Sequence, residues 1–176
     1  MASPNQPSPA PSSSVSPAPT PGHVLAARAV DAMADKKATD ITVLDLRGVT
    51  GMADFFVLGT GHSDIQGRAI PNAAMDGIEE DYGERPWKRE GLETLRWVLL
   101  DYVDLVVHVF VPERRAHYDI ERLWGEATAE TVPPGGDAAD VALLQHLLDG
   151  AAATSDGASD EDASVEDESD EDATEA

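Results

Sequence analysis

The stretch Trp97-Val-Leu-Leu-Asp-Tyr-Val-Asp-Leu-Val-Val-His-Val-Phe110 decides the fold of this chain. Two apolar runs rich in branched residues flank a short polar joint, a pattern typical of a β-hairpin that is buried on at least one face. Alternation predicts that one face of the first strand carries Trp97, Leu99 and Asp101 and the other carries Val98, Leu100 and Tyr102. The residues that we expect in the core are Val98, Leu100, Val106 and Val109.

Helical and strand patterns alternate on both sides of this hairpin. Apolar residues at helical spacing predict a helix over 23–37, and two β-prone runs predict strands over 41–46 and 54–60. Ser63 followed by Gln66 is a capping signature for a helix that should end near residue 81. A last helix follows Pro112 and ends near residue 125. This order predicts a single α/β domain with a mixed five-stranded sheet flanked by helices.

Segments of biased composition flank the predicted domain. Residues 1–22 are mostly Pro, Ser and Ala, which predicts a disordered arm, and the domain occupies residues 23–127. Residues 128–176 contain no Lys or Arg and 15 acidic residues, a net charge of −15, whereas residues 23–127 carry −7 of the total of −22. We expect a mostly disordered acidic tail, with one possible helix over 138–149.

The charge and residue usage exclude several kinds of partner. A net charge of −22 repels phosphate, so we expect no direct DNA contact, at most a minor contact with rRNA, and a basic protein as a possible partner. Adaptation to a salt-rich cytoplasm would explain the same acidity.

The chain has no cysteine and therefore no disulfide or thiolate metal site. No apolar run is long enough to span a membrane and no signal peptide is recognisable, so we expect a cytoplasmic protein.

None of the candidate chemical groups forms a convincing active site. His108 lies within an apolar strand with no partner at metal-ligand spacing. His62 adjoins Ser63, but Ser63 already has a capping role. Gly59-Thr-Gly61 lacks the lysine and the full glycine pattern of a phosphate-binding loop. We therefore expect no catalytic residues, no metal and no cofactor, and we predict that the protein is not an enzyme.

Several segments, in their order and spacing, resemble the ribosomal silencing factor family, also called the Iojap-like family. The resemblance covers roughly residues 23–127 and rests on 35–48 (DKKATDITVLDLRG), 53–61 (ADFFVLGTG), 90–91 (EG), 97–102 (WVLLDY), Asp104, 106–110 (VVHVF) and 118–124 (YDIERLW). Val103 stands where the family usually has a glycine in the hairpin turn, and Pro71 is unusual in the second helix. His62 and Ile65 also depart from the family pattern.

This resemblance implies a domain related to the nucleotidyltransferase fold without its catalytic groups. It also implies a translational repressor that binds large-subunit ribosomal protein fourteen and blocks joining of the small subunit. Members of the family can form homodimers when free. A nucleotide-dependent transferase on a degenerate scaffold, and an interaction module that acts through its acidic tail, are the alternative functions.

The candidate contact residues are large aromatic side chains and their neighbours. Trp97 is the first choice for a binding anchor because aromatic residues dominate the energetics of protein contacts. A buried core tryptophan is the alternative for this position. The full set of predicted partner-binding residues is Trp97, Asp101, Tyr102, Tyr118, Leu123 and Trp124.

Overall fold

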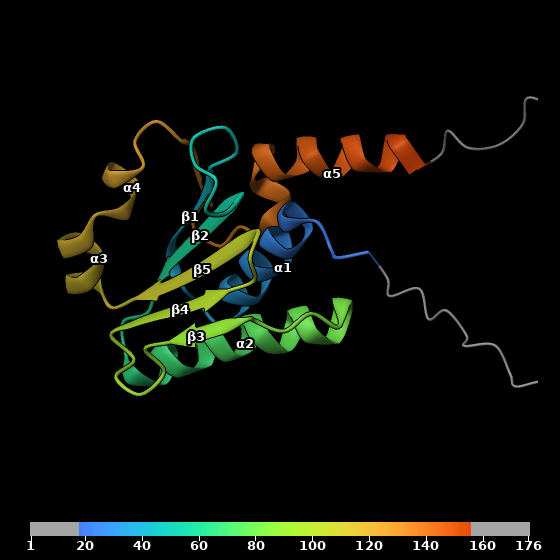
Figure 1. Cartoon of the computed structure of the whole chain (residues 1–176). Helices are drawn as coiled ribbons and strands as arrows, with labels where there is room; N and C mark the ends of the chain where they lie inside the picture. Colours follow the sequence, from blue (N-terminus) through green and yellow to red (C-terminus); the bar gives the residue numbers. More distant parts are fainter. Residues whose placement is uncertain (1–17, 156–176) are drawn as a thin grey trace, which may run out of the picture.

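The computed structural model describes residues 18–155 of the chain. Its helices are α1 (Gly22–Asp35), α2 (Asp64–Tyr82), α3 (Pro112–Tyr118), α4 (Ile120–Leu123), η1 (Ala138–Asp140) and α5 (Ala142–Ser155). Its strands are β1 (Thr39–Asp45), β2 (Phe55–Thr60), β3 (Lys88–Glu90), β4 (Trp97–Asp101), β5 (Leu105–Phe110) and β6 (Thr128–Thr131). They form one mixed sheet in the order β3-β4-β5-β2-β1-β6, in which only β2 and β5 are parallel neighbours (Figure 1).

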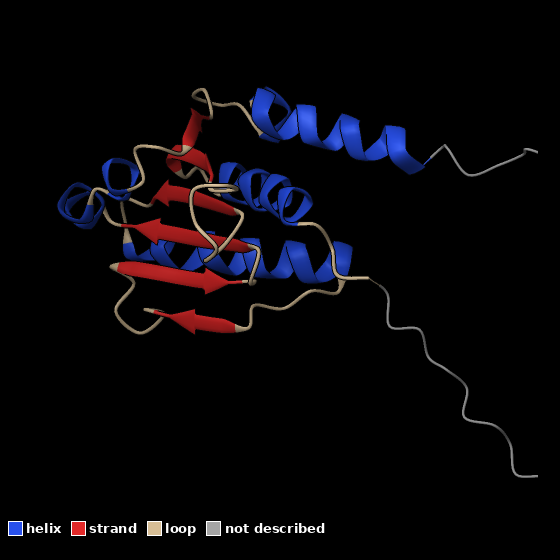
Figure 2. Ribbon diagram, turned by 45° about the horizontal axis from the view of Figure 1, so that its top comes forward, coloured by secondary structure: helices blue, strands red, loops and turns tan. Residues whose placement is uncertain are grey.

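Helices α1, α2 and α5 form a layer on one face of the sheet. In Figures 1 and 2 the strands lie in front of α1 and α2, and α5 lies beside α1 at the upper edge. The main core fills the space between this layer and the strands, and it includes Val98, Leu100 and Val109 as predicted. No described helix is long and apolar enough to cross a membrane.

A second, smaller core lies on the opposite face of the sheet. Phe56, Leu58 and Phe110 are buried there together with Ile120 of α4. Val106 is buried as predicted but belongs to this second core. Among residues 18–155, the helices that border this face are the short α3 and α4, at its left end in Figure 1. The helix layer therefore covers the central strands on one side of the sheet, and the other side is covered only in part.

The prediction of five strands was wrong, because the sheet has six. The two edge strands β3 and β6 fall where the sequence shows no apolar alternation: all three residues of β3 are exposed, as are three of the four in β6. Strand β6 forms because its backbone pairs with β1, Thr42 opposite Thr131, and this partner is distant in the sequence. Short polar strands at a sheet edge follow from such pairing rather than from local propensity.

The ordered structure also extends beyond the domain boundary predicted after residue 127. Val132, Val141 and Leu144 are buried in the main core. Two carboxylates fix this extension: Glu130 accepts hydrogen bonds from the backbone N–H groups of Ala142 (2.8 Å) and Leu143 (2.9 Å), and Asp31 accepts one from Ala138. The helix expected over 138–149 is present as η1 and α5. Residues 1–17 and 156–176, which hold most of the predicted arm and the last part of the predicted acidic tail, lie outside the described residues.

Two of the positions that depart from the family pattern, Pro71 and Val103, are accommodated differently. Helix α2 runs from Asp64 to Tyr82 through a buried Pro71, and Ser63 caps it as predicted by accepting from the backbone N–H of Gln66 at 3.2 Å. Val103 adopts a φ of 74°, a left-handed conformation that is unfavourable for a β-branched residue. The backbone N–H of Val103 donates a hydrogen bond to the Asp101 carboxylate at 2.8 Å, which helps to hold the turn.

Candidate interaction surface

Six aromatic rings gather on the sheet face that α3 and α4 border, and we call this surface the aromatic face. Its members are Phe56, Trp97, His108, Phe110, Tyr118 and Trp124. The Trp97 ring centroid lies 4.5 Å from that of Tyr118 and 5.1 Å from that of Phe110. Trp124 meets Phe56 edge to face at 6.0 Å. Such pairs add to the stabilisation from burial alone, so the face is an ordered array.

The register of β4 and β5 places Trp97 within this array. Trp97 lies opposite Phe110, and Leu99 lies opposite His108. Because side chains alternate across a strand, Trp97 and Leu99 share the face with these two rings, while Val98 points into the main core. The alternation predicted for the hairpin is confirmed.

A hydrogen bond connects Trp97 to His108. The indole Nε1 donates to Nδ1 of His108 at 3.2 Å, and the His108 side chain is 4% exposed. Burial lowers the pKa of His108 to about 4, so the ring is neutral near pH 7. The ring proton then belongs on Nε2, which has no hydrogen-bond partner among the described residues. His108 is a structural residue, as its sequence context suggested, and it orients the indole.

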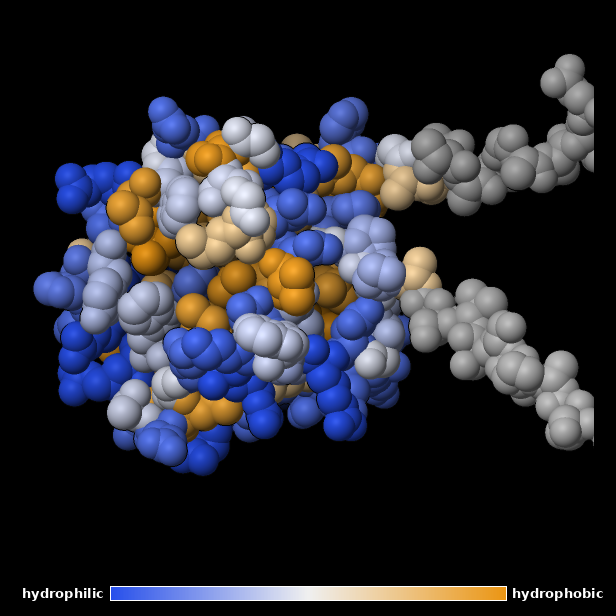
Figure 3. Space-filling view, viewed as in Figure 1, coloured by the Kyte–Doolittle hydropathy of each residue, from blue (hydrophilic) through white to orange (hydrophobic). Residues whose placement is uncertain are grey.

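Part of the aromatic face is open to solvent. Trp97, Leu99 and Trp124 are half-buried, Tyr118 is 42% exposed, and Leu123, at the end of α4, is 70% exposed. Figure 3 shows hydrophobic side chains among polar ones over the strands on this side of the molecule. A partly exposed group of large rings on a rigid sheet is typical of a protein contact surface.

The structure brings most of the predicted contact residues to one side of the sheet and separates one of them. Trp97, Tyr118 and Trp124 belong to the aromatic face, and Leu123 lies beside Trp124. Asp101 lies on the same side at the end of β4, where its carboxylate supports the turn at Val103. Tyr102 was misplaced by the prediction: it is 7% exposed and packs in the main core on the opposite side of the sheet, where burial raises the pKa of its hydroxyl.

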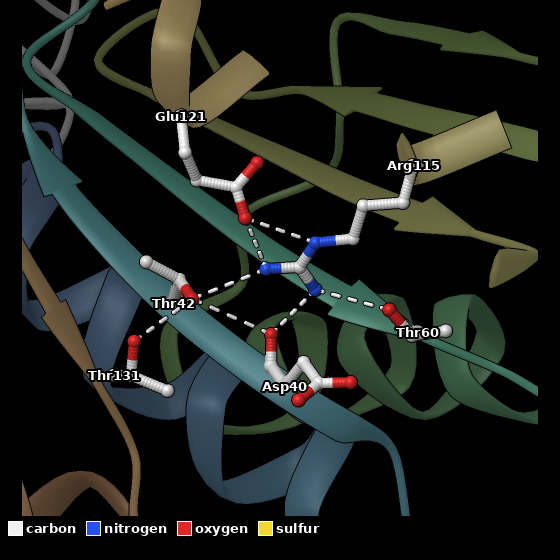
Figure 4. A network of polar contacts seen from close by, with 6 residues as sticks. All are labelled: Asp40, Thr42, Thr60, Arg115, Glu121 and Thr131. Carbon is white, nitrogen blue, oxygen red and sulfur yellow. Dashed lines mark hydrogen bonds and ion pairs between the residues drawn. The ribbon is translucent and has the colours of Figure 1, made fainter. Parts of the chain in front are cut away.

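Sequence reasoning missed the residue that anchors α3 and α4 to the sheet. The Arg115 guanidinium donates to Glu121 of α4, to the hydroxyls of Thr42 (3.1 Å) and Thr60 (3.0 Å), and to the backbone oxygen of Asp40 (Figure 4). Its side chain is 12% exposed. An arginine in a short, charged helix gives no local signal of such a role, because all its partners except Glu121 are distant in sequence.

The groups that could have supplied chemistry are engaged elsewhere. The Nε2 atom of His62 lies 2.8 Å from the hydroxyl of Thr39, and the Ser63 hydroxyl caps α2, so these two residues do not form a nucleophile and base. Across residues 18–155, no group of three or more His, Asp or Glu side chains is arranged to hold a metal ion.

These features define a small α/β domain with one covered and one partly open sheet face. The model of the family described as "Ribosomal silencing factor during starvation" (RsfS) matches residues 19–172. A ribosomal silencing factor RsfS from Bacillus subtilis is 44% identical over 103 residues, covering 58% of this chain and 84% of that protein. The chloroplastic protein Iojap of Zea mays is 35% identical over 105 residues, covering 58% of this chain and 44% of that protein.

A solved structure shares the fold of this chain. The crystal structure of a protein from Chromobacterium violaceum superposes with a TM-score of 0.58 and 36% sequence identity, covering 60% of this chain and 88% of that one. The chain therefore belongs to the ribosomal silencing factor family. The resemblance drawn from the sequence motifs is confirmed, whereas the relation to the nucleotidyltransferase fold stays a prediction.

Proposed function

We propose that this protein is a translational repressor that binds the large ribosomal subunit and sterically blocks joining of the small subunit. Its membership of the ribosomal silencing factor family supports a role in regulating translation. The proposed partner on the subunit is large-subunit ribosomal protein fourteen. Such a mechanism needs a complementary surface and bulk but no chemical step, so the protein acts without catalysis, in the cytoplasm where ribosomes work.

The observation that carries this proposal is the partly exposed aromatic face. Trp97 is ordered by ring contacts and by its hydrogen bond to His108, yet it stays half-buried rather than fully covered. Large aromatic side chains held rigidly at a surface are the usual energetic centres of protein interfaces. We therefore assign Trp97, Tyr118, Leu123 and Trp124 to the contact, with Asp101 at its margin.

Sedimentation with separated ribosomal subunits tests the proposal. Wild-type protein should sediment with large subunits and reduce the formation of complete ribosomes when small subunits are added. Trp97→Ala and the milder Trp97→Phe should both weaken binding. Trp87→Ala is the matched control, because Trp87 is 78% exposed and lies outside the aromatic face. If the wild-type protein were absent from the large-subunit fraction, the proposed function would be contradicted.

The same assay separates the folded domain from the acidic tail. A chain that ends at residue 155 keeps β6 and α5 and loses most of the tail acids, whereas a cut after residue 127 would also strip β6 from β1. Full binding by the chain ending at residue 155 is expected if the aromatic face makes the contact. Loss of binding would favour the acidic tail instead. The homodimer predicted for the free protein stays a prediction.

A further inference from the structure

Helices α3 and α4 bury very little of their own surface. Helix α3 has seven residues, none of which is buried, and α4 has four, of which only Ile120 is buried. Helices this short are unstable alone in water, because nucleating the first turn is costly. Apart from Ile120 and the ring contacts of Tyr118 and Trp124, little apolar packing holds this segment on the sheet.

The guanidinium of Arg115 provides a polar contact between this segment and the sheet. Its Nε donates to Glu121 Oε1 at 2.9 Å, and its Nη atoms reach β1 through Thr42 and β2 through Thr60 (Figure 4). The Thr42 hydroxyl lies 3.3 Å from that of Thr131, which extends the network to β6. One planar group, whose side chain is only 12% exposed, thus connects α3 and α4 to two neighbouring strands.

The rings of the aromatic face are attached to the same two helices. Tyr118 lies three residues after Arg115 in α3, and Trp124 lies three residues after Glu121 at the end of α4. Tyr118 meets Trp97 and Trp124 meets Phe56. Fixing Arg115 and Glu121 to the sheet therefore fixes where these two rings stand.

We propose that Arg115 is the positioning residue of the aromatic face, which holds α3 and α4 on the sheet and so sets the arrangement of Tyr118 and Trp124 that the ribosomal partner meets. This inference rests on the proposed function. It requires an arginine, because a lysine offers one compact ammonium group and cannot span acceptors on both sides as a planar fork does. Glu121 shares the role through its ion pair with Arg115.

The test uses the full-length chain with Arg115→Ala, Arg115→Lys and the matched control Arg114→Ala, which removes the same charge from the same helix outside the network. We expect the two Arg115 variants to bind large subunits at least about tenfold more weakly, because α3 and α4 would no longer hold Tyr118 and Trp124 in a fixed arrangement. Amide exchange should accelerate in residues 112–124 and stay unchanged in β2 and β5. Arg114→Ala should match the wild type in both measurements.

Chemical rescue separates positioning from general stabilisation. Ethylguanidinium at millimolar concentration can fill the space left by Arg115→Ala and should restore both binding and slow exchange, whereas the same concentration of urea should not. Arg115→Lys, which still fills the site, should not respond. Unchanged binding by both variants would overturn the inference, and so would faster exchange across the whole sheet without rescue.

Failure of the proposed function leads to a different result. If the wild-type protein did not bind large subunits, that result alone would contradict the proposed repressor function. The exchange of residues 112–124 in Arg115→Ala, with and without ethylguanidinium, would still show whether Arg115 positions the aromatic face. Exchange in this segment equal to that of the wild type would exclude such a role.

Discussion

The indole Nε1 of Trp97 donates a hydrogen bond to Nδ1 of His108 at 3.2 Å, diagonally across β4 and β5. The indole can only donate, so the bond requires a free lone pair on Nδ1 and hence a neutral imidazole. Burial acts in the same direction, because it lowers the pKa of His108 to about 4. The anchor of the aromatic face therefore depends on the protonation state of a single buried ring.

Stability should fall in mild acid because of this ring. The ordinary pKa of histidine is 6.5 and the folded value is about 4, so the unfolded chain binds the proton more readily between these values. The contribution of neutral His108 to the free energy of unfolding is fully present above about pH 6.5 and is lost as the pH falls towards 4. Between pH 7 and pH 5 the loss should be about 2 kcal/mol.

Urea denaturation at both pH values measures this effect. His108→Gln keeps an acceptor for the indole but does not titrate, and it leaves all carboxylates in place. The wild type should therefore lose about 2 kcal/mol more than the variant between pH 7 and pH 5. Equal losses in the two proteins would show that His108 does not carry the dependence.

Replacing Val103 with glycine should stabilise the protein. Val103 has a φ of 74° and a side chain that is 61% exposed, so the substitution relieves the left-handed conformation and removes little packing. We expect a gain of about 1 kcal/mol in the free energy of unfolding. Val103→Ala keeps a Cβ atom at the same φ and should gain less. A glycine variant no more stable than the wild type would contradict this interpretation of the turn.

Leu123→Glu should weaken binding to the large subunit without unfolding the domain. Leu123 is 70% exposed beside Trp124, so a carboxylate there would be desolvated only on contact with the partner. We expect about tenfold weaker binding, or about 1.4 kcal/mol, and a change in stability within about 0.5 kcal/mol. Ile65→Glu is the control, because Ile65 is 81% exposed on α2 in the opposite layer. Equal behaviour of the two variants would remove Leu123 from the contact.

Glu130→Ala should loosen the C-terminal extension. The Glu130 carboxylate accepts from the backbone N–H groups of Ala142 and Leu143 and so caps α5 from the edge of the sheet. The substitution should lower the free energy of unfolding by about 1 kcal/mol and speed amide exchange in α5, because two backbone N–H groups at the start of the helix lose their acceptor. Exchange in β4 and β5 should not change. Unaltered exchange in α5 would show that apolar packing alone holds the helix.

The hairpin and its two faces were predictable because the signal is local. Alternation between Trp97 and Leu100 separates the half-buried side chains from the fully buried ones, as the structure confirms. The edge strands were not predictable, because Lys88–Glu90 and Thr128–Thr131 are polar segments that become strands only beside β4 and β1. Their pairing is a consequence of the tertiary fold.

The candidate site was predictable to the extent that aromatic residues mark it. Trp97, Tyr118 and Trp124 were found by residue type and family motif, and the structure places their rings on one face. Tyr102 was selected by the same criterion, but alternation along β4 already put it on the other side. Arg115 could not be found, since its role depends on threonines that the fold brings from β1 and β2.

The position of β1, next to the edge strand β6, has a consequence for the newly made chain. Its partner β2 follows within a short connection, but its other partner, β6, is made only after all the other strands. Until then the outer amide and carbonyl groups of β1 are unpaired, and an unpaired strand edge readily recruits other extended chains. Translation that stops before residue 128 would release a product in which this edge of β1 stays unpaired and prone to aggregation, so synthesis of the short polar strand β6 also covers that edge.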